Sequence, residues 1–409
     1  MSESSFIEFK HGWKAILGAI VGVGSGLTGI VFYTHGVFVI PITEEMGWSR
    51  GATQFAFSFV MMSAAITAPF IGMITDKYGA RRLALFGLFT LGFAFAGLSL
   101  TTDNILTYYG LWIFMAVIAA GTFPVTWTRA INTWFDGRRG LALGLTMMGT
   151  GIAAAIGPVY AATLIENFGW RDAYRALGLT LLVFSFPMAY LFFRERGAAT
   201  SDEPVSPTMM TGLTPREALS GTKFWILGIA LLFVCFGVAG LISNMVPLLI
   251  DKGFAAKEAA GYAGLVGINV IIGRIVVGYL IDRIWAPLIS FIFMILPAAS
   301  CLLLAPDQPA VLGISIAALL VGLAAGAELD LMAFLISRYF GMKNYGQLYG
   351  GLFIFFAVGS GSAPALFGLW HDFAGSYQTI LYVTAAMFVF GSSLLLLMGP
   401  YPEFEEQPA

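Results

Sequence analysis

The sequence predicts an all-α membrane protein with twelve transmembrane helices in two pseudo-symmetric six-helix bundles. Three observations lead to this fold class: the composition, the long apolar runs, and a repeat between the two halves of the chain. Hydrophobic residues make up 58% of the 409 residues and charged residues only 11%, at a mean hydropathy of +0.84. Soluble proteins carry roughly 25% charged residues, so most of this chain is suited to lipid or to other apolar helices.

Runs of about 20 apolar residues have the length of a membrane-spanning helix. Six such runs precede a polar break that is rich in Pro, Ser and Thr, and six follow it. We place the spans at 15–41, 54–75, 83–101, 106–133, 140–163, 172–193, 224–250, 259–281, 285–305, 310–336, 346–369 and 376–399. The chain then divides into an N-terminal half (1–195), a linker (196–222) and a C-terminal half (223–409). Within the linker, "TPREAL" predicts the start of a short surface helix.

The distribution of basic residues predicts the orientation. Fourteen of the 21 Lys and Arg residues fall on the side of the spans that carries both termini, and five fall on the other side. Because cytoplasmic segments are enriched in Lys and Arg, both termini and the linker are expected in the cytoplasm. The N-terminus lacks the basic region and the cleavage site of a signal peptide, so the first apolar run is expected to be retained. We expect a monomer, integral to the lipid bilayer of the plasma (inner) membrane.

Landmarks in the first half recur in the second at a near-constant offset. The pairs lie 205 or 206 residues apart: Pro41 with Pro247, Gly47 with Gly253, Asp76 with Asp282, and Phe135 with Phe340. A constant offset across distant landmarks indicates an internal repeat of six spans. Parallel repeats of this kind are typical of transporters whose binding site lies between the halves near the membrane midplane.

A loop motif carries a family resemblance. The stretch "GMITDKYGARR" (Gly72–Arg82) ends span 2, and a degraded copy, "GYLIDR", ends span 8. It resembles the loop of the major facilitator superfamily, and with the twelve spans and the repeat the resemblance covers the whole chain. In that family the loop holds the cytoplasmic side through ion pairs between span ends. The resemblance therefore implies a gating role for Asp76, Lys77, Arg81 and Arg82, with Asp282 and Arg283 as a weaker counterpart. Plain anchoring by positive charge would explain Arg81 and Arg82 alone.

Three further stretches resemble one branch of this superfamily. "YTHGVFVIPITEEMGWSR", "NTWFDGRRGLALGL" and "GRIVVGYLIDR" are similar to the monocarboxylate porters and oxalate:formate antiporters. That branch typically has a basic residue on span 8 that meets the substrate carboxylate, and here the residue is Arg274. The chain departs from the branch at Val270, where proton-coupled animal members have an acid. Span 11 also lacks the lysine of the oxalate exchanger, and one cavity cation instead of two favours a monoanion over a dianion.

The residues around Arg274 support a role in carboxylate binding. Arg274 lies eight residues before Asp282, about 12 Å from the cytoplasmic end at about 1.5 Å per helical residue. In a hydrocarbon core about 30 Å thick this is near the midplane, where a charge requires a partner or a function. A guanidinium binds a carboxylate bidentately. The alternative is a structural ion pair with an acid on a neighbouring span.

Span 10 contains two acids, Glu328 and Asp330, either of which could pair with Arg274. They are two residues apart, about 200° around a helix of about 3.6 residues per turn, so both cannot face the cavity. A cation beside a buried carboxyl opposes the effect of burial on its protonation. Such a carboxyl is a candidate for proton coupling, and a purely structural pair is the alternative.

The repeat selects Asp330 as the acid that faces the cavity. Arg129 of span 4 maps onto Phe334, and Asp330 lies one turn before Phe334 on the face that Gly322 and Gly326 continue. If Arg129 faces the cavity, Asp330 is expected to do so too. The other acid is then expected to pack inside its own half.

Five further residues are candidates for the site. Arg129 either guides anions at the inner mouth or extends to the interface. Tyr33 and His35 lie in span 1, which lines the cavity in the family that the chain resembles, and the unperturbed pKa of a histidine, about 6.5, suits a proton relay. A non-titrating, hydrogen-bonded histidine is the alternative. Asn244 precedes a proline on span 7 and could bond the substrate, whereas Asn269 lies about 140° from the arginine of span 8 and ranks lower.

We therefore expect a secondary active transporter of a small organic monocarboxylate, coupled to protons. A carboxylate exchanger, or an exporter of amphipathic small molecules, is the runner-up, since 36 phenylalanines could line an apolar pocket. A sensor or scaffold would be expected to carry a soluble signalling domain, and an enzyme a nucleotide loop, a metal cluster or a nucleophile with its base. Neither is apparent, and no cofactor is expected. A net charge of −2 gives no footprint for nucleic acid, and the two cysteines, Cys235 and Cys301, imply neither disulfide nor metal site.

Overall fold

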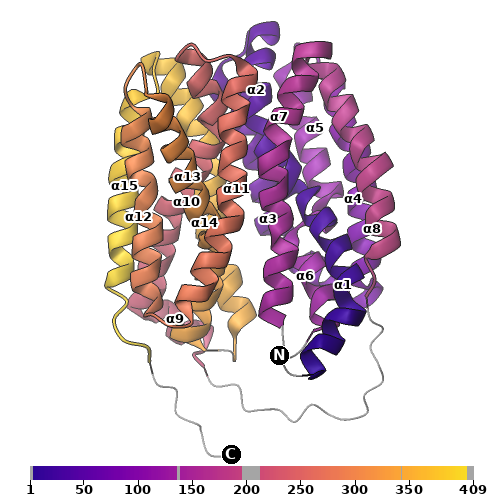
Figure 1. The fold of residues 1–409 in the computed structure, drawn as a ribbon, viewed down its shortest axis with the longest axis vertical. Coiled ribbons are helices and arrows are strands. Elements are labelled where there is room, and N and C mark those ends of the chain that lie inside the picture. Colours follow the sequence, from indigo (N-terminus) through magenta and orange to yellow (C-terminus); the bar gives the residue numbers. More distant parts are fainter. Residues whose placement is uncertain (1–2, 136–138, 196–211, 342, 403–409) are drawn as a thin grey trace, which may run out of the picture.

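The computed structural model describes residues 3–135, 139–195, 212–341 and 343–402, nearly all of them helical (Figure 1). The first half contains α1 (Glu3–Gly24), η1 (Leu27–Val31), α2 (Phe32–Met46), α3 (Arg50–Tyr78), α4 (Ala80–Gly97), η2 (Leu98–Leu100), α5 (Ile105–Ile118), η3 (Ala120–Thr122), α6 (Pro124–Asn132), α7 (Arg139–Thr180), η4 (Leu181–Ser185) and α8 (Phe186–Phe192). The second half contains α9 (Pro215–Ser220), α10 (Thr222–Asp251), α11 (Ala256–Ile281), α12 (Ala286–Leu304), α13 (Val311–Phe340), α14 (Tyr345–Ala374) and α15 (Gln378–Leu396).

Nine helical stretches among the described residues are long and apolar enough to cross a membrane. One of them, Leu141–Phe192, has 52 residues and covers two predicted spans, because the chain turns at Gly169, whose φ is 78°. The predicted spans 2 and 4 correspond to α3 and to the pair α5 and α6, which are not among the nine. The all-helical membrane fold is confirmed, and the full count of twelve stays a prediction.

Predicted span 4 is not one continuous helix. It breaks between α5 and α6, where Phe123 is extended with φ −61° and ψ 148° and Pro124 begins the next helix. A residue before proline avoids the helical region, and proline suits the first helical turn. Gly121 lies in the break because a Cβ atom there would come within 2.4 Å of the Leu83 carbonyl oxygen. The prediction of an unbroken helix over 106–133 was wrong because these local preferences override the apolar pattern.

The internal repeat is visible in the helices that carry its landmarks. Pro41 lies inside α2 and Pro247 inside α10. Each helix is followed by a left-handed glycine, Gly47 with φ 66° and Gly253 with φ 89°, a conformation that glycine adopts without strain. α2 and α10 also pack on each other, as expected of equivalent helices that meet at a pseudo-twofold axis.

The short helix predicted from "TPREAL" is present as α9. The Thr214 hydroxyl accepts a hydrogen bond from the Glu217 backbone N–H at 3.3 Å, and the Glu217 carboxylate accepts from the Thr214 backbone N–H at 2.8 Å. These two bonds form a capping box. The N–H and hydroxyl of Thr214 hold the pKa of the Glu217 carboxyl below its usual value. Leu213 donates to the Phe340 carbonyl oxygen, which fixes the segment before α9 to the end of α13.

The two halves lie side by side, with both termini at the same end of the bundle (Figure 1). Three helix pairs join them: α3 with α14, α7 with α11, and α2 with α10. The packing is closest away from the termini. A Cβ atom on Gly267 of α11 would lie 2.0 Å from the Ala155 backbone nitrogen of α7, and one on Gly361 of α14 would lie 2.8 Å from Met61 Cβ of α3. Real Cβ atoms essentially never approach so closely, so only glycine permits this contact.

The same helix faces are open toward the end that carries the termini. Gly278 follows Gly267 by eleven residues on α11, and Gly350 precedes Gly361 by eleven on α14. At about 100° per residue each pair shares a face to within about 20°. A Cβ atom on Gly278 or Gly350 would meet nothing within 4 Å. The halves are therefore in contact at the end away from the termini and separated at the terminal end.

Candidate functional site

An ion pair between two helices of the second half forms the centre of the candidate site. The Arg274 Nη1 of α11 lies 3.0 Å from the Asp330 Oδ1 of α13. The Arg274 side chain is only 6% exposed, whereas that of Asp330 is 33% exposed. The Arg274 Nε is buried without a hydrogen-bond partner. The guanidinium thus has a donor left over, and its carboxylate partner remains accessible.

The location of Arg274 on α11 places it beside the interface between the halves. Arg274 follows Gly267 by seven residues, which returns to the same helix face within about 20°. Gly267 packs against α7 of the first half, and Gly278, four residues beyond Arg274, meets nothing within 4 Å. Arg274 therefore lies where the contact between the halves ends and the open space begins.

Glycines on α13 bring the two charges together. Cβ atoms on Gly322 and Gly326 would lie 2.4 Å and 2.1 Å from the carbonyl oxygens of Val266 and Val270 of α11. Asp330 continues this stripe one turn further. The expectation that the glycines continue a cavity-lining face was wrong, since their face packs on α11. Small residues allow such close helix packing in membranes, and Asp330 reaches Arg274 because of it.

We predict that Gly326→Ala lowers the thermal denaturation midpoint of the detergent-solubilised protein by several degrees. The added methyl would force α11 and α13 apart, an overpacking cost of about 1–3 kcal/mol. Gly313→Ala is the matched control on the same helix, because a Cβ atom there would meet only Leu303 Cδ2 at 3.7 Å. Equal midpoints for the two variants would contradict the close approach.

Glu328 is not the ion-pair partner of Arg274, although the two groups interact electrostatically. It borders a cavity of about 20 Å³ that α10, α12 and α13 line with Leu231, Val234 and Ser290 among others, and its carboxyl interacts with the Cys235 thiol. Its Oε2 is buried without a hydrogen-bond partner. A cavity of this volume has room for about one water molecule.

Aromatic residues complete the surroundings of the ion pair. Tyr33, on α2 of the first half, interacts electrostatically with both Arg274 and Glu328, so the two halves contribute jointly to the site. Tyr349 of α14 interacts electrostatically with Asp330. It begins a row of half-buried rings in which Tyr349 and Phe353 have centroids 6.3 Å apart. Sequence reasoning missed Tyr349, although the four-residue spacing of aromatic residues on span 11 was a usable signal.

His35 is buried inside the first half. Its ring lies 5.5 Å from Phe57 of α3 and 5.1 Å from Trp112 of α5, between ring centroids. Neither ring nitrogen has a hydrogen-bond partner. His35 follows Tyr33 by two residues, about 200° around the helix, so it lies on the face of α2 opposite to the one that approaches Arg274.

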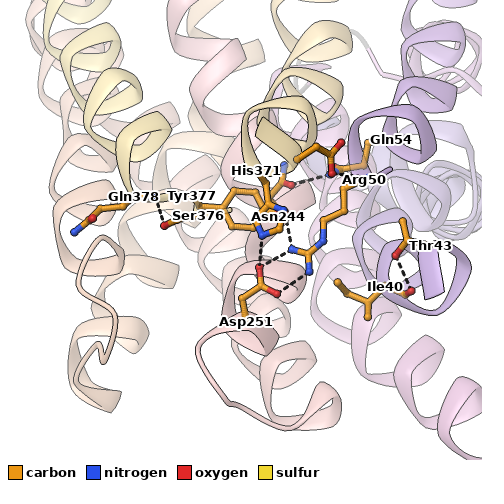
Figure 2. Close-up of polar contacts among 11 residues, drawn as sticks. Ile40, Thr43, Arg50, Gln54, Asn244, Asp251, His371, Ser376, Tyr377 and Gln378 are labelled. Atoms are coloured by element: carbon orange, nitrogen blue, oxygen red, sulfur yellow. Dashed lines mark hydrogen bonds and ion pairs between the residues drawn. The ribbon is translucent and has the colours of Figure 1, made fainter. Parts of the chain in front are cut away.

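The side chains of both candidate asparagines form hydrogen bonds with groups other than Arg274. The Asn244 oxygen accepts from Gln54 Nε2 of the first half at 2.9 Å, and its Nδ2 donates to the Gly240 carbonyl oxygen at 2.9 Å. Asn244 thus joins the halves in their closed contact (Figure 2). The Asn269 Nδ2 donates to the Leu265 carbonyl oxygen one turn earlier in its own helix.

The charged groups expected to gate lie at the terminal end. Arg81 donates to the carbonyl oxygens of Phe193 and Tyr190 at 2.6 Å and 2.8 Å, which joins the start of α4 to the end of α8. Arg82, Asp282 and Arg129 are exposed, and Arg283 lies over the ring of Tyr279.

The side chains of two further gating candidates, Asp76 and Lys77, lie outside the described part of the structure. No ion pair joins two described side chains across the halves at this end, as expected where the halves are apart.

The opposite end is closed by a charged cluster that crosses between the halves (Figure 2). Arg50, the first residue of α3, binds both carboxylate oxygens of Asp251 on α10, at 2.5 Å and 2.7 Å. The His371 Nε2 of α14 lies 3.2 Å from the same carboxylate. The backbone N–H groups of Arg50 and Gly51 donate to Asp372 of α14 at 3.0 Å and 2.8 Å, so an acid of the second half caps a helix of the first. We call Arg50, Asp251, His371 and Asp372 the outer latch.

Over the described ranges, no group of three or more His, Cys, Asp or Glu side chains could hold a metal ion.

Comparison with known proteins places the chain in a family. The sequence profile described as Major Facilitator Superfamily matches residues 21–329. An oxalate:formate antiporter of Oxalobacter formigenes is 28% identical over 233 residues, 55% of this chain and 53% of that protein. Monocarboxylate transporter 11 of Mus musculus is 23% identical over 404 residues, 94% of this chain and 87% of that protein.

A bacterial homologue of the human lysosomal transporter Spinster, solved in an inward-facing and occupied conformation, shares the fold. It has a TM-score of 0.71 at 15% identity, over 95% of this chain and 97% of that chain.

Proposed function

This chain belongs to the Major Facilitator Superfamily, and we propose that it is a secondary active transporter that moves small organic monocarboxylate anions together with protons by alternating access. The relatives named as a monocarboxylate transporter and an oxalate:formate antiporter support the carboxylate class. We further propose that it works as a monomer in the plasma (inner) membrane with both termini in the cytoplasm. The division into two halves joined by the linker 196–222 is part of the same proposal.

The observation that carries this proposal is the buried Arg274–Asp330 pair beside the opening between the halves. A guanidinium with an unused donor can bind a carboxylate through two parallel hydrogen bonds, and it does so more strongly where water is scarce. Tyr33 from the first half would contact the same ligand, while Asn244, Asn269 and Arg129 are secondary candidates. α14 supplies no Lys or Arg to this site, since Tyr345–Ala374 contains neither. A single cation favours a monoanion.

Asp330 is the proposed proton carrier. While it is ionised, it neutralises Arg274, and a substrate anion would have to displace it. When a proton neutralises Asp330, Arg274 is free to bind the substrate, so anion and proton enter the site together. Glu328 and His35 are alternative carriers, but Glu328 borders a separate cavity and His35 lies on the opposite face of α2 from Tyr33.

Alternating access requires that one end closes as the other opens. With the termini in the cytoplasm, the outer latch seals the external side and the space beside Gly278 and Gly350 opens inward. Asp76, Lys77, Arg81, Arg82, Asp282 and Arg283 are proposed to form the opposite, inner gate when the halves close on the cytoplasmic side.

We predict that Asp76→Asn impairs turnover more than binding. The substitution keeps the shape of the side chain but removes its charge from the inner gate, so the closed-inside state loses ion pairs. Transport should fall about tenfold, the effect of about 1.4 kcal/mol, while the equilibrium Kd for substrate stays within about twofold. A lost affinity with unchanged turnover would contradict the gating role.

The aromatic row on α14 favours a second candidate function. Tyr349, Phe353 and Phe356 are half-buried side chains in sequence along the helix beside the ion pair, with Phe353 and Phe356 centroids 5.2 Å apart. Such a surface suits an amphipathic anion and would also serve an exporter or an exchanger.

Uptake of labelled C2 to C8 acids into proteoliposomes, with and without a pH gradient, tests both proposed functions. Accumulation that follows the pH gradient supports symport, and uptake that needs a carboxylate inside supports exchange.

A further inference from the structure

The outer latch contains a carboxylate site that is already occupied by a carboxylate of the protein itself. Both terminal nitrogens of Arg50 donate to Asp251, Nη1 to Oδ2 at 2.5 Å and Nη2 to Oδ1 at 2.7 Å. This is the two-pronged geometry with which a guanidinium binds any carboxylate. The side chains of Arg50 and Asp251 are 16% and 29% exposed, so water and small solutes reach the pair.

An open basin lies beside this pair. It has a volume of about 360 Å³ and is lined by Thr43, Glu44, Trp48, Arg50, His371, Asp372 and Gly375. Small-molecule sites have volumes of roughly 300–1,000 Å³, so a small monocarboxylate fits with room to spare. Arg50 and His371 supply positive charge, and Trp48 supplies an apolar surface.

The two side chains that hold Asp251 belong to different halves. Arg50 begins α3 of the first half, whereas His371 lies on α14 of the second half, as Asp251 lies on α10. If the halves separate, Arg50 loses its carboxylate but Asp251 retains His371 at 3.2 Å. Opening therefore leaves Arg50 without its counter-ion, and an anion from solution can take the place of Asp251.

His371 holds Asp251 within the second half. Its Nε2 lies 3.2 Å from the Asp251 carboxylate, and its ring packs against Tyr377 with ring centroids 4.7 Å apart.

We propose that Arg50 is a second carboxylate-binding site, which an external monocarboxylate occupies in exchange for Asp251, and that this exchange releases the outer latch. The ligand class rests on the proposed function, because the transported anion is the carboxylate that reaches this basin. Substrate would thus promote the opening through which it enters. His371 holds Asp251 during the exchange.

The test measures the distance between the halves at the outer end, in a protein whose central site is disabled. Spin labels are placed on Thr102→Cys of the first half and on Ala374→Cys of the second half, since both positions are exposed. The background carries Arg274→Ala, and Cys235 and Cys301 are replaced by Ser so that only the two new cysteines are labelled. Sodium acetate is compared with sodium chloride at matched ionic strength, since screening alone weakens an exposed ion pair. We expect acetate to raise the ratio of long to short distances about threefold above chloride, within the range of an exposed ion pair.

Two variants separate the site from general loosening. Arg50→Gln should show the long distance in both salts with no acetate effect. Asp251→Asn retains Arg50 and should open in chloride alone, which guards against an Arg50 variant that fails to fold. Equal effects of acetate and chloride in the Arg274→Ala background, or an acetate effect that persists in Arg50→Gln, would overturn the proposal. Arg274→Ala already removes the proposed transport site. The acetate effect on the outer latch can therefore be measured even if Arg274 proves not to bind the transported substrate.

Discussion

Arg274→Ala is expected to abolish substrate binding and transport while the protein remains folded and monodisperse in detergent. The guanidinium is 6% exposed and has one ionic partner, Asp330. Removing one member of a buried, hydrogen-bonded charge pair costs about 2–5 kcal/mol of binding, and every 1.4 kcal/mol is tenfold in affinity. We therefore expect the Kd for a carboxylate to rise at least about thirtyfold, measured by equilibrium binding. Asp330 can take up a proton when its partner is lost, so the fold should survive.

Arg274→Lys should rescue binding poorly, because an ammonium group provides a point charge without the planar pair of donors. Arg175→Ala is the matched control, since Arg175 forms an exposed ion pair with Asp172 three residues earlier, at 2.7 Å, and exposed pairs contribute little. Substrate affinity that is unchanged in Arg274→Ala would remove Arg274 from the site. A loss of affinity in Arg175→Ala as well would point to a general effect of removing charge.

The membrane fold could be predicted from the sequence because apolar length and repeat spacing are local properties of the chain. The pairs Pro41 with Pro247 and Gly47 with Gly253 have equivalent places at the ends of α2 and α10. The break between α5 and α6 was not predicted, although Gly121 and Pro124 signalled it. Those two residues were outweighed by the continuous apolar run, and such runs do not distinguish one helix from two that meet at an angle.

The candidate site was only partly predictable, because its geometry depends on contacts between distant helices. The identity of Arg274 followed from one charge in an apolar run. That Asp330 and not Glu328 is its partner depends on the stripe formed by Gly322 and Gly326, which the sequence shows but does not assign to a neighbouring helix. Tyr349 comes from another helix, and only the fold brings it close to Asp330.

The outer latch illustrates the same limit. Arg50, Asp251 and His371 are far apart in the sequence and each lies near a predicted span end, where charge is ordinary. The sequence gives no reason to pair them. The fold places the first residue of α3 against the last of α10, and one carboxylate then serves two cations from different halves. A charged residue at a span end can therefore take part in conformational change as well as anchoring.

Asp330→Asn is expected to uncouple transport from protons. The amide keeps the shape of the carboxyl but carries no charge and accepts no proton at neutral pH. Arg274 then lacks its resting counter-ion at every pH, so the variant should bind the anion with an affinity nearly independent of pH. It should also still exchange labelled for unlabelled substrate across the membrane. The parent protein should show the opposite behaviour, with affinity that rises as the pH falls and Asp330 becomes protonated.

The decisive measurement is accumulation in proteoliposomes under a pH gradient, with protein-free liposomes as background. One pH unit corresponds to about 1.36 kcal/mol, so a one-to-one symporter of a monoanion should accumulate substrate about tenfold. Asp330→Asn should reach a ratio of about one. Glu328→Gln is the matched control, since Glu328 borders a separate cavity in the second half; it should accumulate as the parent does and lose thermal stability instead. Full accumulation by Asp330→Asn would show that the proton is carried elsewhere. His35→Gln would then be the variant to measure, because His35 is the other candidate for proton coupling and is buried inside the first half.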